Sequence, residues 1–235
     1  MSRRIIDLCR GSTAGKTANL YVPTSDNVTL GAWFILNDPY HQHLLRTSPS
    51  QTKSLPPSLE TIQDAISHRP TVLFLHGAAA TRAVEWRVKT YLGFTSRLHV
   101  NVLAPDYRGF GDSTGSPSTE GLVLDAYASW RWLVEEGGAK PEDVVIVGHS
   151  LGTGVAGQLA RRLAEEGVKP RGVVLLAPFT SISKLLETYS ILGVPILQPM
   201  QTFSLGISEF FVVPKSRVVL NIRPRAYEIF HTSRF

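Results

Sequence analysis

Residues 148–152 have the sequence Gly-His-Ser-Leu-Gly, the G-x-S-x-G pattern of a nucleophilic serine. The pattern follows the apolar run 143–147 and precedes a helical repeat at 151–167, so we expect it at a sharp turn from a strand into a helix. Such a turn holds the hydroxyl of Ser150 above the carboxyl edge of a sheet, beside the N–H groups that begin the helix. We therefore predict Ser150 as a nucleophile and the backbone N–H of Leu151 as a donor to an oxyanion.

The strained backbone of such a turn requires small residues two positions before and after the serine. Gly148 and Gly152 meet this requirement. The alternative interpretation is a glycine-bearing turn that carries an ordinary serine. In that case the hydroxyl would be buried in packing, with no N–H donors turned toward the space in front of it.

A second short motif, His76-Gly77-Ala78, follows the apolar run 71–75. A nucleophilic serine of this type needs another N–H donor from a loop at the same sheet edge, and a His-Gly pair followed by small residues fits that loop. We predict that Ala78 donates its backbone N–H, which leaves its side chain free to vary. Because His76 precedes the serine and lies on the strand that carries this loop, we expect it to stabilise the loop rather than act as a base.

A third loop, at residues 106–113, follows the apolar run 100–105 and contains glycines at 109 and 111. Its glycines suit a tightly turned backbone. We expect Asp106 and Arg108 to pair and to hold this loop beside Ser150, which is a structural role rather than a catalytic one.

Apolar runs alternate with helical patterns along the chain, which is typical of an α/β fold whose mostly parallel sheet is flanked by helices. A hairpin is expected at the N-terminal side, over residues 20–36. Buried strands are predicted at 71–75, 100–105, 143–147 and 172–178. Helices are predicted at 82–97, from Ser116 or Ser118 to Gly137, and at 151–167. The buried faces of the last two are predicted to carry Leu122, Ala126, Trp130, Leu133, Val155, Leu159 and Leu163.

We predict a single domain over residues 1–235. Residues 38–70 are rich in proline, serine and histidine and are interpreted as a surface insertion rather than a domain boundary. Residues 181–214 are apolar without clear periodicity, so they form either a lid over an acyl pocket or a core segment whose covering strands are missing. Residues 215–235 carry five basic side chains and one acidic one, and are interpreted as an atypical basic tail.

The charge and cysteine content exclude several classes of function. The chain has 24 Lys and Arg against 19 Asp and Glu, and the excess is concentrated in the tail, so we expect no nucleic-acid partner. The single cysteine, Cys9, excludes an internal disulfide and a cysteine-built zinc site, and we predict neither a metal nor a cofactor. We find no signal peptide or membrane-spanning run, which predicts a cytoplasmic or peripherally membrane-associated protein. The sequence leaves the oligomeric state open.

Four segments resemble the α/β-hydrolase superfamily, specifically its monoacylglycerol lipase and lysophosphatidylserine lipase branch: HGAAATR, PDYRGFGDSTG, GHSLGTGVA and LLAPFTSI. The resemblance runs from about residue 18 to about residue 210. It implies hydrolysis of an acylglycerol or lysophospholipid ester through an acyl-enzyme on Ser150, with Ala78 and Leu151 as oxyanion donors. Members usually have Asn at the position of Ala78, a difference that changes a side chain and spares the donor N–H.

The residues after Ser150 do not complete the catalytic set of this superfamily. The chain order there is Ser, then Asp or Glu, then His. No Asp follows Asp143, and the only later histidine is His231, three residues after Glu228. We expect that the acid and base are missing, that 215–235 replaces the family's C-terminal part, and that activity is impaired. A divergent chain in which His231 reaches Ser150, and a non-catalytic interaction protein on the same fold, remain as alternatives.

Overall fold

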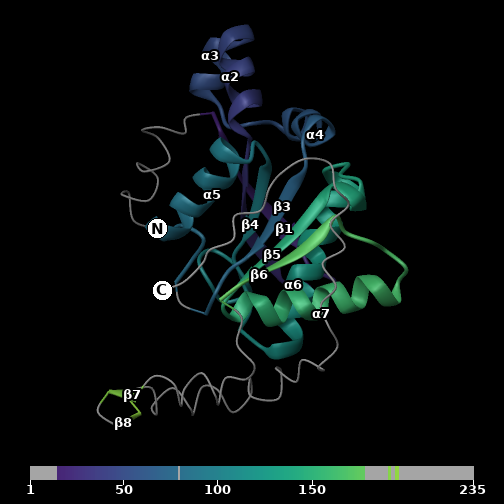
Figure 1. Ribbon diagram of the computed structural model, residues 1–235. Helices are drawn as coiled ribbons and strands as arrows, with labels where there is room; N and C mark the ends of the chain where they lie inside the picture. Colours follow the sequence, from purple (N-terminus) through teal and green to yellow (C-terminus); the bar gives the residue numbers. More distant parts are fainter. Residues whose placement is uncertain (1–14, 79, 178–189, 192–193, 196–235) are drawn as a thin grey trace.

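The computed structural model describes residues 15–78, 80–177, 190–191 and 194–195 (Figure 1). Its centre is a six-stranded sheet in the order β1-β2-β4-β3-β5-β6. The strands are β1 (Thr17–Pro23), β2 (Thr29–Ile35), β3 (Thr71–Leu75), β4 (Asn101–Pro105), β5 (Val144–His149) and β6 (Gly172–Leu176). β1 and β2 form an antiparallel hairpin, β2 is also antiparallel to β4, and the remaining four strands are parallel. The predicted fold class is confirmed.

The register of the central strands brings several chain segments to one edge of the sheet. Leu75 lies opposite Gly148 in the pair of β3 and β5, and His149 lies opposite Leu176 in the pair of β5 and β6. Because the carboxyl ends of parallel strands meet at the same edge, the segments that follow these strands begin side by side. The motifs predicted to carry chemistry therefore start at this edge.

Residues 38–68 contain three helices, α2 (Asp38–Thr47), α3 (Pro49–Ser54) and α4 (Leu59–His68). The hydroxyl of Ser58 caps α4 by accepting a hydrogen bond from the backbone N–H of Thr61, at 3.2 Å. Three apolar side chains of α4 are buried in the core, Ile62, Ala65 and Ile66, whereas Leu59 at its start is exposed. One face of α4 therefore packs against the core of the domain.

The remaining helices are α5 (Glu85–Arg97), α6 (Thr119–Arg131) and α7 (Leu151–Glu165), and α6 continues into a π-helical turn at 132–136. α5 covers one face of the sheet, whereas α6 and α7 cover the other (Figure 1). The helix predicted to begin at residue 82 begins at Glu85, because the preceding loop holds Arg82 in a buried ion pair. Ser118, rather than Ser116, caps α6.

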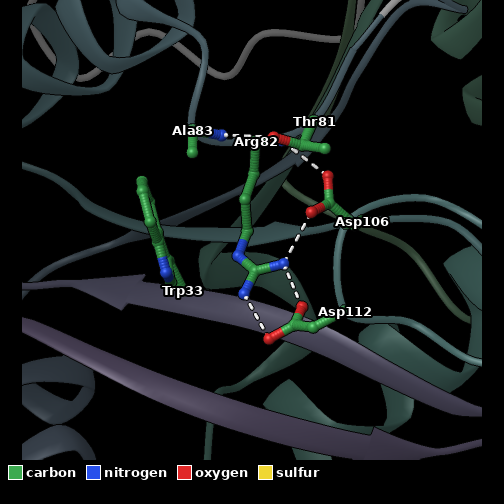
Figure 2. A pocket seen from close by; sticks show the side chains of 7 residues that line it. Trp33, Thr81, Arg82, Ala83, Asp106 and Asp112 are labelled. Carbon is green, nitrogen blue, oxygen red and sulfur yellow. Dashed lines mark hydrogen bonds and ion pairs between the residues drawn. The ribbon is translucent and has the colours of Figure 1, made fainter. Parts of the chain in front are cut away.

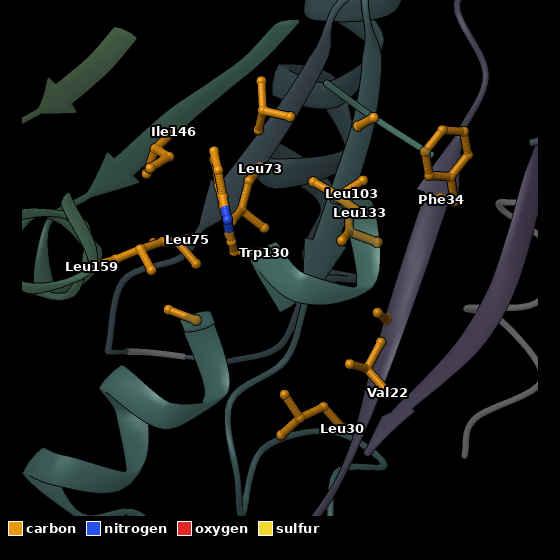
Figure 3. Close-up of a cluster of buried hydrophobic side chains, with 14 of the residues drawn as sticks. Val22, Leu30, Phe34, Leu73, Leu75, Leu103, Trp130, Leu133, Ile146 and Leu159 are labelled. Atoms are coloured by element: carbon orange, nitrogen blue, oxygen red, sulfur yellow. The ribbon is translucent and has the colours of Figure 1, made fainter. Parts of the chain in front are cut away.

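The core between the sheet, α6 and α7 is built from the predicted apolar faces. All seven side chains predicted for those faces are at most 3% exposed. Figure 3 shows Trp130 of α6 and Leu159 of α7 against the sheet residues Leu73, Leu75 and Leu103. Full burial of one such side chain contributes about 1.5–3 kcal/mol, so these faces fix both helices on the sheet. They thereby fix the N-terminus of α7, where Ser150 lies.

β6 differs from its prediction as a fully buried strand. Within the described part of the chain it pairs with β5 alone, and Val174 is 38% exposed. The predicted lid-like segment 181–214 and basic tail 215–235 lie outside the described residues, apart from β7 (Ser190–Ile191) and β8 (Val194–Pro195), which pair antiparallel. Among the described helices, none combines the length and apolar character needed to cross a bilayer.

Candidate active site

Ser150 lies between β5 and α7 with a backbone conformation of φ 50° and ψ −119°. A non-glycine residue held in such a conformation costs on the order of 1–3 kcal/mol and persists only where its surroundings enforce it. The backbone N–H of Ser150 donates to the carbonyl of Leu176 at 3.0 Å, and its carbonyl accepts from the N–H of Thr153 at 2.8 Å. The hydroxyl of Thr153 donates to the same carbonyl at 2.7 Å. These bonds hold the sharp turn.

The two glycines of the turn allow β5 and α7 to approach closely. A Cβ at Gly148 would lie 2.3 Å from the carbonyl oxygen of Gly152. A Cβ at Gly152 would lie 2.0 Å from the carbonyl oxygen of Leu75 and 2.8 Å from that of His76. Distances below 3.0 Å to backbone atoms cannot be relieved by rotating a side chain. Both positions therefore require glycine for the observed packing of the turn.

The loop after β3 runs directly against this turn. A Cβ at Gly77 would lie 3.2 Å from the Cβ of Ser150 and 3.2 Å from Nδ1 of His149. The following residue, Ala78, is exposed, whereas Leu151 is 5% exposed at the start of α7. The first N–H groups of a helix have no acceptor within the helix. The structure thus brings the two segments chosen as oxyanion donors to the two sides of Ser150.

His76 has the contacts of a residue that stabilises this loop. Its side chain is 1% exposed, and Nδ1 lies 2.7 Å from the carbonyl oxygen of Gly77. Because a carbonyl oxygen only accepts hydrogen bonds, Nδ1 carries the hydrogen. Nε2 lies 3.3 Å from Oδ1 of Asp106, and the ring packs 4.4 Å from the ring of Tyr107.

The predicted ion pair between Asp106 and Arg108 is wrong. Asp106 is fully buried and accepts hydrogen bonds from the backbone N–H of Arg82 at 2.5 Å and from its Nη1 at 2.6 Å. Arg108 turns instead toward the hairpin and α6, where it pairs with Asp26 at 2.7 Å and with Asp125 at 2.9 Å. The hydrogen bond from Arg108 lowers the pKa of Asp26 to about 2. Each charge finds a partner on a different element, so the loop is held from two directions.

A cavity of about 320 Å³ lies beside the loop that follows β3 (Figure 2). Its lining residues are Trp33, Thr81, Arg82, Ala83, Asp106, Gly111 and Asp112. The Arg82 guanidinium lies 5.3 Å from the centre of the Trp33 ring and binds the Asp112 carboxylate with Nη1 at 2.7 Å and Nη2 at 3.1 Å. The Arg82 charge of this cavity is therefore paired with the carboxylates of Asp106 and Asp112.

The first turn of α5 supplies two residues that the sequence analysis missed. The ring of Trp86 lies 5.2 Å from the ring of His149, and the guanidinium of Arg87 lies 4.7 Å from the centre of the Trp86 ring. Burial, together with the nearby charges of Arg87 and His76, lowers the pKa of His149. A single arginine within a helical pattern is usually solvated, so the sequence carried no signal for its burial.

The candidates for the acid and base of the site are the glutamates and the histidine that follow Ser150 in the chain. Glu165 pairs with Arg161, and Glu166 pairs with Arg162, at the exposed end of α7. His231, the candidate base, lies outside the described residues.

A model of the alpha/beta hydrolase family matches residues 72–229. The chain is 38% identical over 187 residues to the lysophosphatidylserine lipase ABHD12 of Rattus norvegicus, covering 78% of this chain and 44% of that protein. It is 35% identical over 178 residues to protein ABHD12B of Homo sapiens, covering 76% and 46%. It therefore spans less than half the length of these relatives. An alpha-beta hydrolase from Vibrio vulnificus has the same fold, with a TM-score of 0.65 at 21% identity, covering 90% of this chain and 63% of that one.

Proposed function

Since the chain belongs to the alpha/beta hydrolase family, we propose that it is a serine ester hydrolase with Ser150 as its nucleophile. The observation that carries this proposal is the strained backbone of Ser150, at φ 50°, with Gly77 packed against it. We propose an acylglycerol or lysophospholipid ester as the substrate. This proposal is supported by the 38% identity of the chain to a relative that is named a lysophosphatidylserine lipase. Such esters partition into lipid layers, so the proposal includes peripheral contact with a membrane surface.

In the proposed reaction the hydroxyl oxygen of Ser150 forms a bond to the ester carbonyl carbon, and the carbonyl electrons move to its oxygen. The backbone N–H groups of Ala78 and Leu151 stabilise that oxyanion. Collapse of the intermediate expels the alcohol and leaves an acyl-enzyme, which water hydrolyses. A base must accept the proton of the hydroxyl and then donate it to the oxygen of the departing alcohol, and His231 is the candidate in this sequence.

The second candidate function is a non-catalytic protein on the same fold. It is favoured by the sequence after Ser150, which contains a single histidine and no aspartate. Without a working base, catalysis falls to what the oxyanion hole and binding supply, about 10³–10⁴ over the reaction in water. The two functions therefore predict different reactivity at the same hydroxyl.

A fluorophosphonate probe, which reacts only with an activated serine, separates these functions. We expect labelling of the folded wild-type protein at Ser150, identified by peptide mass spectrometry, and its loss in Ser150→Ala. The control is Ser96→Ala. The exposed hydroxyl of Ser96 on α5 donates to the Leu92 carbonyl, and removing this hydroxyl should leave labelling intact. Loss of labelling in His231→Ala would identify the base. No labelling in cooperatively folded wild-type protein would favour the non-catalytic function.

A further inference from the structure

Arg87 spans the loop that follows β3. Its side chain begins in the first turn of α5, and the residue is 1% exposed. Nη1 donates to the carbonyl of Thr81 at 2.7 Å, and Nη2 donates to the carbonyl of Gly77 at 3.0 Å. One planar guanidinium therefore holds the first and last parts of the 77–81 loop at a fixed separation.

The bond to Gly77 also fixes the direction of the next N–H. The Gly77 carbonyl accepts a second hydrogen bond, from Nδ1 of His76 at 2.7 Å, so two buried donors hold it toward the interior. In a trans peptide the C=O and the following N–H point in opposite directions. The N–H of Ala78 must then point away from Arg87 and His76. Because Gly77 packs on Ser150, the N–H of Ala78 lies next to the candidate nucleophile.

The same turn of α5 also contacts the other half of the site. The ring of Trp86 has the guanidinium of Arg87 4.7 Å from its centre and the ring of His149 5.2 Å away. His149 immediately precedes Ser150. Arg87 is therefore linked to the loop by hydrogen bonds and to the nucleophile turn by ring packing.

We propose that Arg87 is a positioning residue that holds the 77–81 loop so that the N–H of Ala78 faces an oxyanion formed at Ser150. The oxyanion role rests on the proposed function, whereas the hold on the loop does not. Arginine suits this position because its fork donates to two carbonyls at once, and charged donors form stronger hydrogen bonds than neutral ones. A lysine has a single donor nitrogen on a flexible stem, so it would hold the two carbonyls less rigidly than the planar fork does.

Hydrogen–deuterium exchange tests the hold on the loop without requiring activity. The reporter is a peptide over 76–84, where the backbone N–H of Arg82 bonds to Asp106 at 2.5 Å and that of Val84 bonds to the Thr81 carbonyl at 3.3 Å. In Arg87→Met we expect this peptide to exchange at least about tenfold faster, with a smaller increase in Arg87→Lys. The control is Arg131→Met, an arginine at an exposed pair with Glu135 on another helix, which should leave the peptide's exchange unchanged.

Ester hydrolysis and probe labelling test the oxyanion role. We expect Arg87→Met to lower kcat by about 10–100-fold while KM changes by less than about threefold, with partial recovery in Arg87→Lys. Arg131→Met should retain kcat. If Arg87→Met does not fold, both the exchange of the 76–84 peptide and kcat are measured on Arg87→Lys.

Two results would overturn the proposal: unchanged exchange of the 76–84 peptide in both Arg87 variants, or faster exchange with unchanged kcat. If wild-type protein neither labels nor hydrolyses esters, the proposed function fails, and exchange alone decides whether Arg87 holds the loop.

Discussion

Replacing Gly152 by alanine should separate the nucleophile turn from the loop after β3. The added Cβ would lie 2.0 Å from the carbonyl oxygen of Leu75, whereas such contacts essentially never fall below 3.0 Å. Either β3 or α7 must therefore move by about 1 Å, and overpacking of this kind costs about 1–3 kcal/mol. Both contacting atoms belong to backbone, so we expect the upper end of that range. The better helix propensity of alanine offsets about 1 kcal/mol, which leaves a net loss of about 2 kcal/mol.

Gly157 provides the matched control within the same helix. A Cβ there would meet nothing within 4 Å, so Gly157→Ala should stabilise the protein by about 0.5–1 kcal/mol through helix propensity alone. The free energies of unfolding of the two variants, measured by urea denaturation, should thus differ by about 3 kcal/mol, and their Tm values by about 6–12 °C. Probe labelling should fall by about 100-fold in Gly152→Ala, because a shift of about 1 Å misplaces Ser150. Equal stability of the two variants would refute the reasoning.

Two further predictions concern half-buried His149 and fully buried Asp106. The lowered pKa of His149 means that the folded protein binds fewer protons there than the unfolded chain, whose pKa is near 6.5. Stability should therefore be lost as the pH falls below 6.5, and a series of Tm values from about pH 8 to about pH 5 should show a smaller loss in His149→Gln. Asp106→Asn should cost about 2–4 kcal/mol because it removes the carboxylate that faces buried Arg82, whereas Asp143→Asn, at an exposed pair, should cost less than about 1 kcal/mol. Equal denaturation midpoints for the two Asn variants would contradict this account.

The fold could be predicted from the sequence because the patterns that form its strands and helices span only a few neighbouring residues. Apolar runs predicted β3 and β5, and the helical stripe of α7 predicted the burial of Val155, Leu159 and Leu163. The strand β6 was predicted correctly, but its full burial was not observed within the described residues, because an apolar run shows that a strand forms and not how many neighbours pack on it. Composition gave no sign that α4 would bury one face against the core, since its segment is rich in proline and serine.

The strand-to-helix turn at Ser150 was predicted for the same reason: serine and two glycines at fixed spacing, between a strand and a helix, constrain one another over five residues. The partners of charged side chains depend on which elements meet in three dimensions. Asp106 pairs with Arg82 across 24 positions rather than with Arg108, two positions away. Arg87 likewise bonds to Gly77 through the packing of α5, which local sequence does not encode.

The conformation of Ser150 bears on the choice between an enzyme and a non-catalytic protein. A turn from β5 into α7 at φ 50° and ψ −119° would be less costly with glycine, which adopts this region without strain. The chain retains a serine there, held by bonds from Leu176 and Thr153. In the described structure its side chain does not cap α7, although serine caps helices well. Within the described residues, a helix cap therefore does not offset the cost of this conformation. We propose that a reaction at the Ser150 oxygen accounts for the serine, which favours the hydrolase.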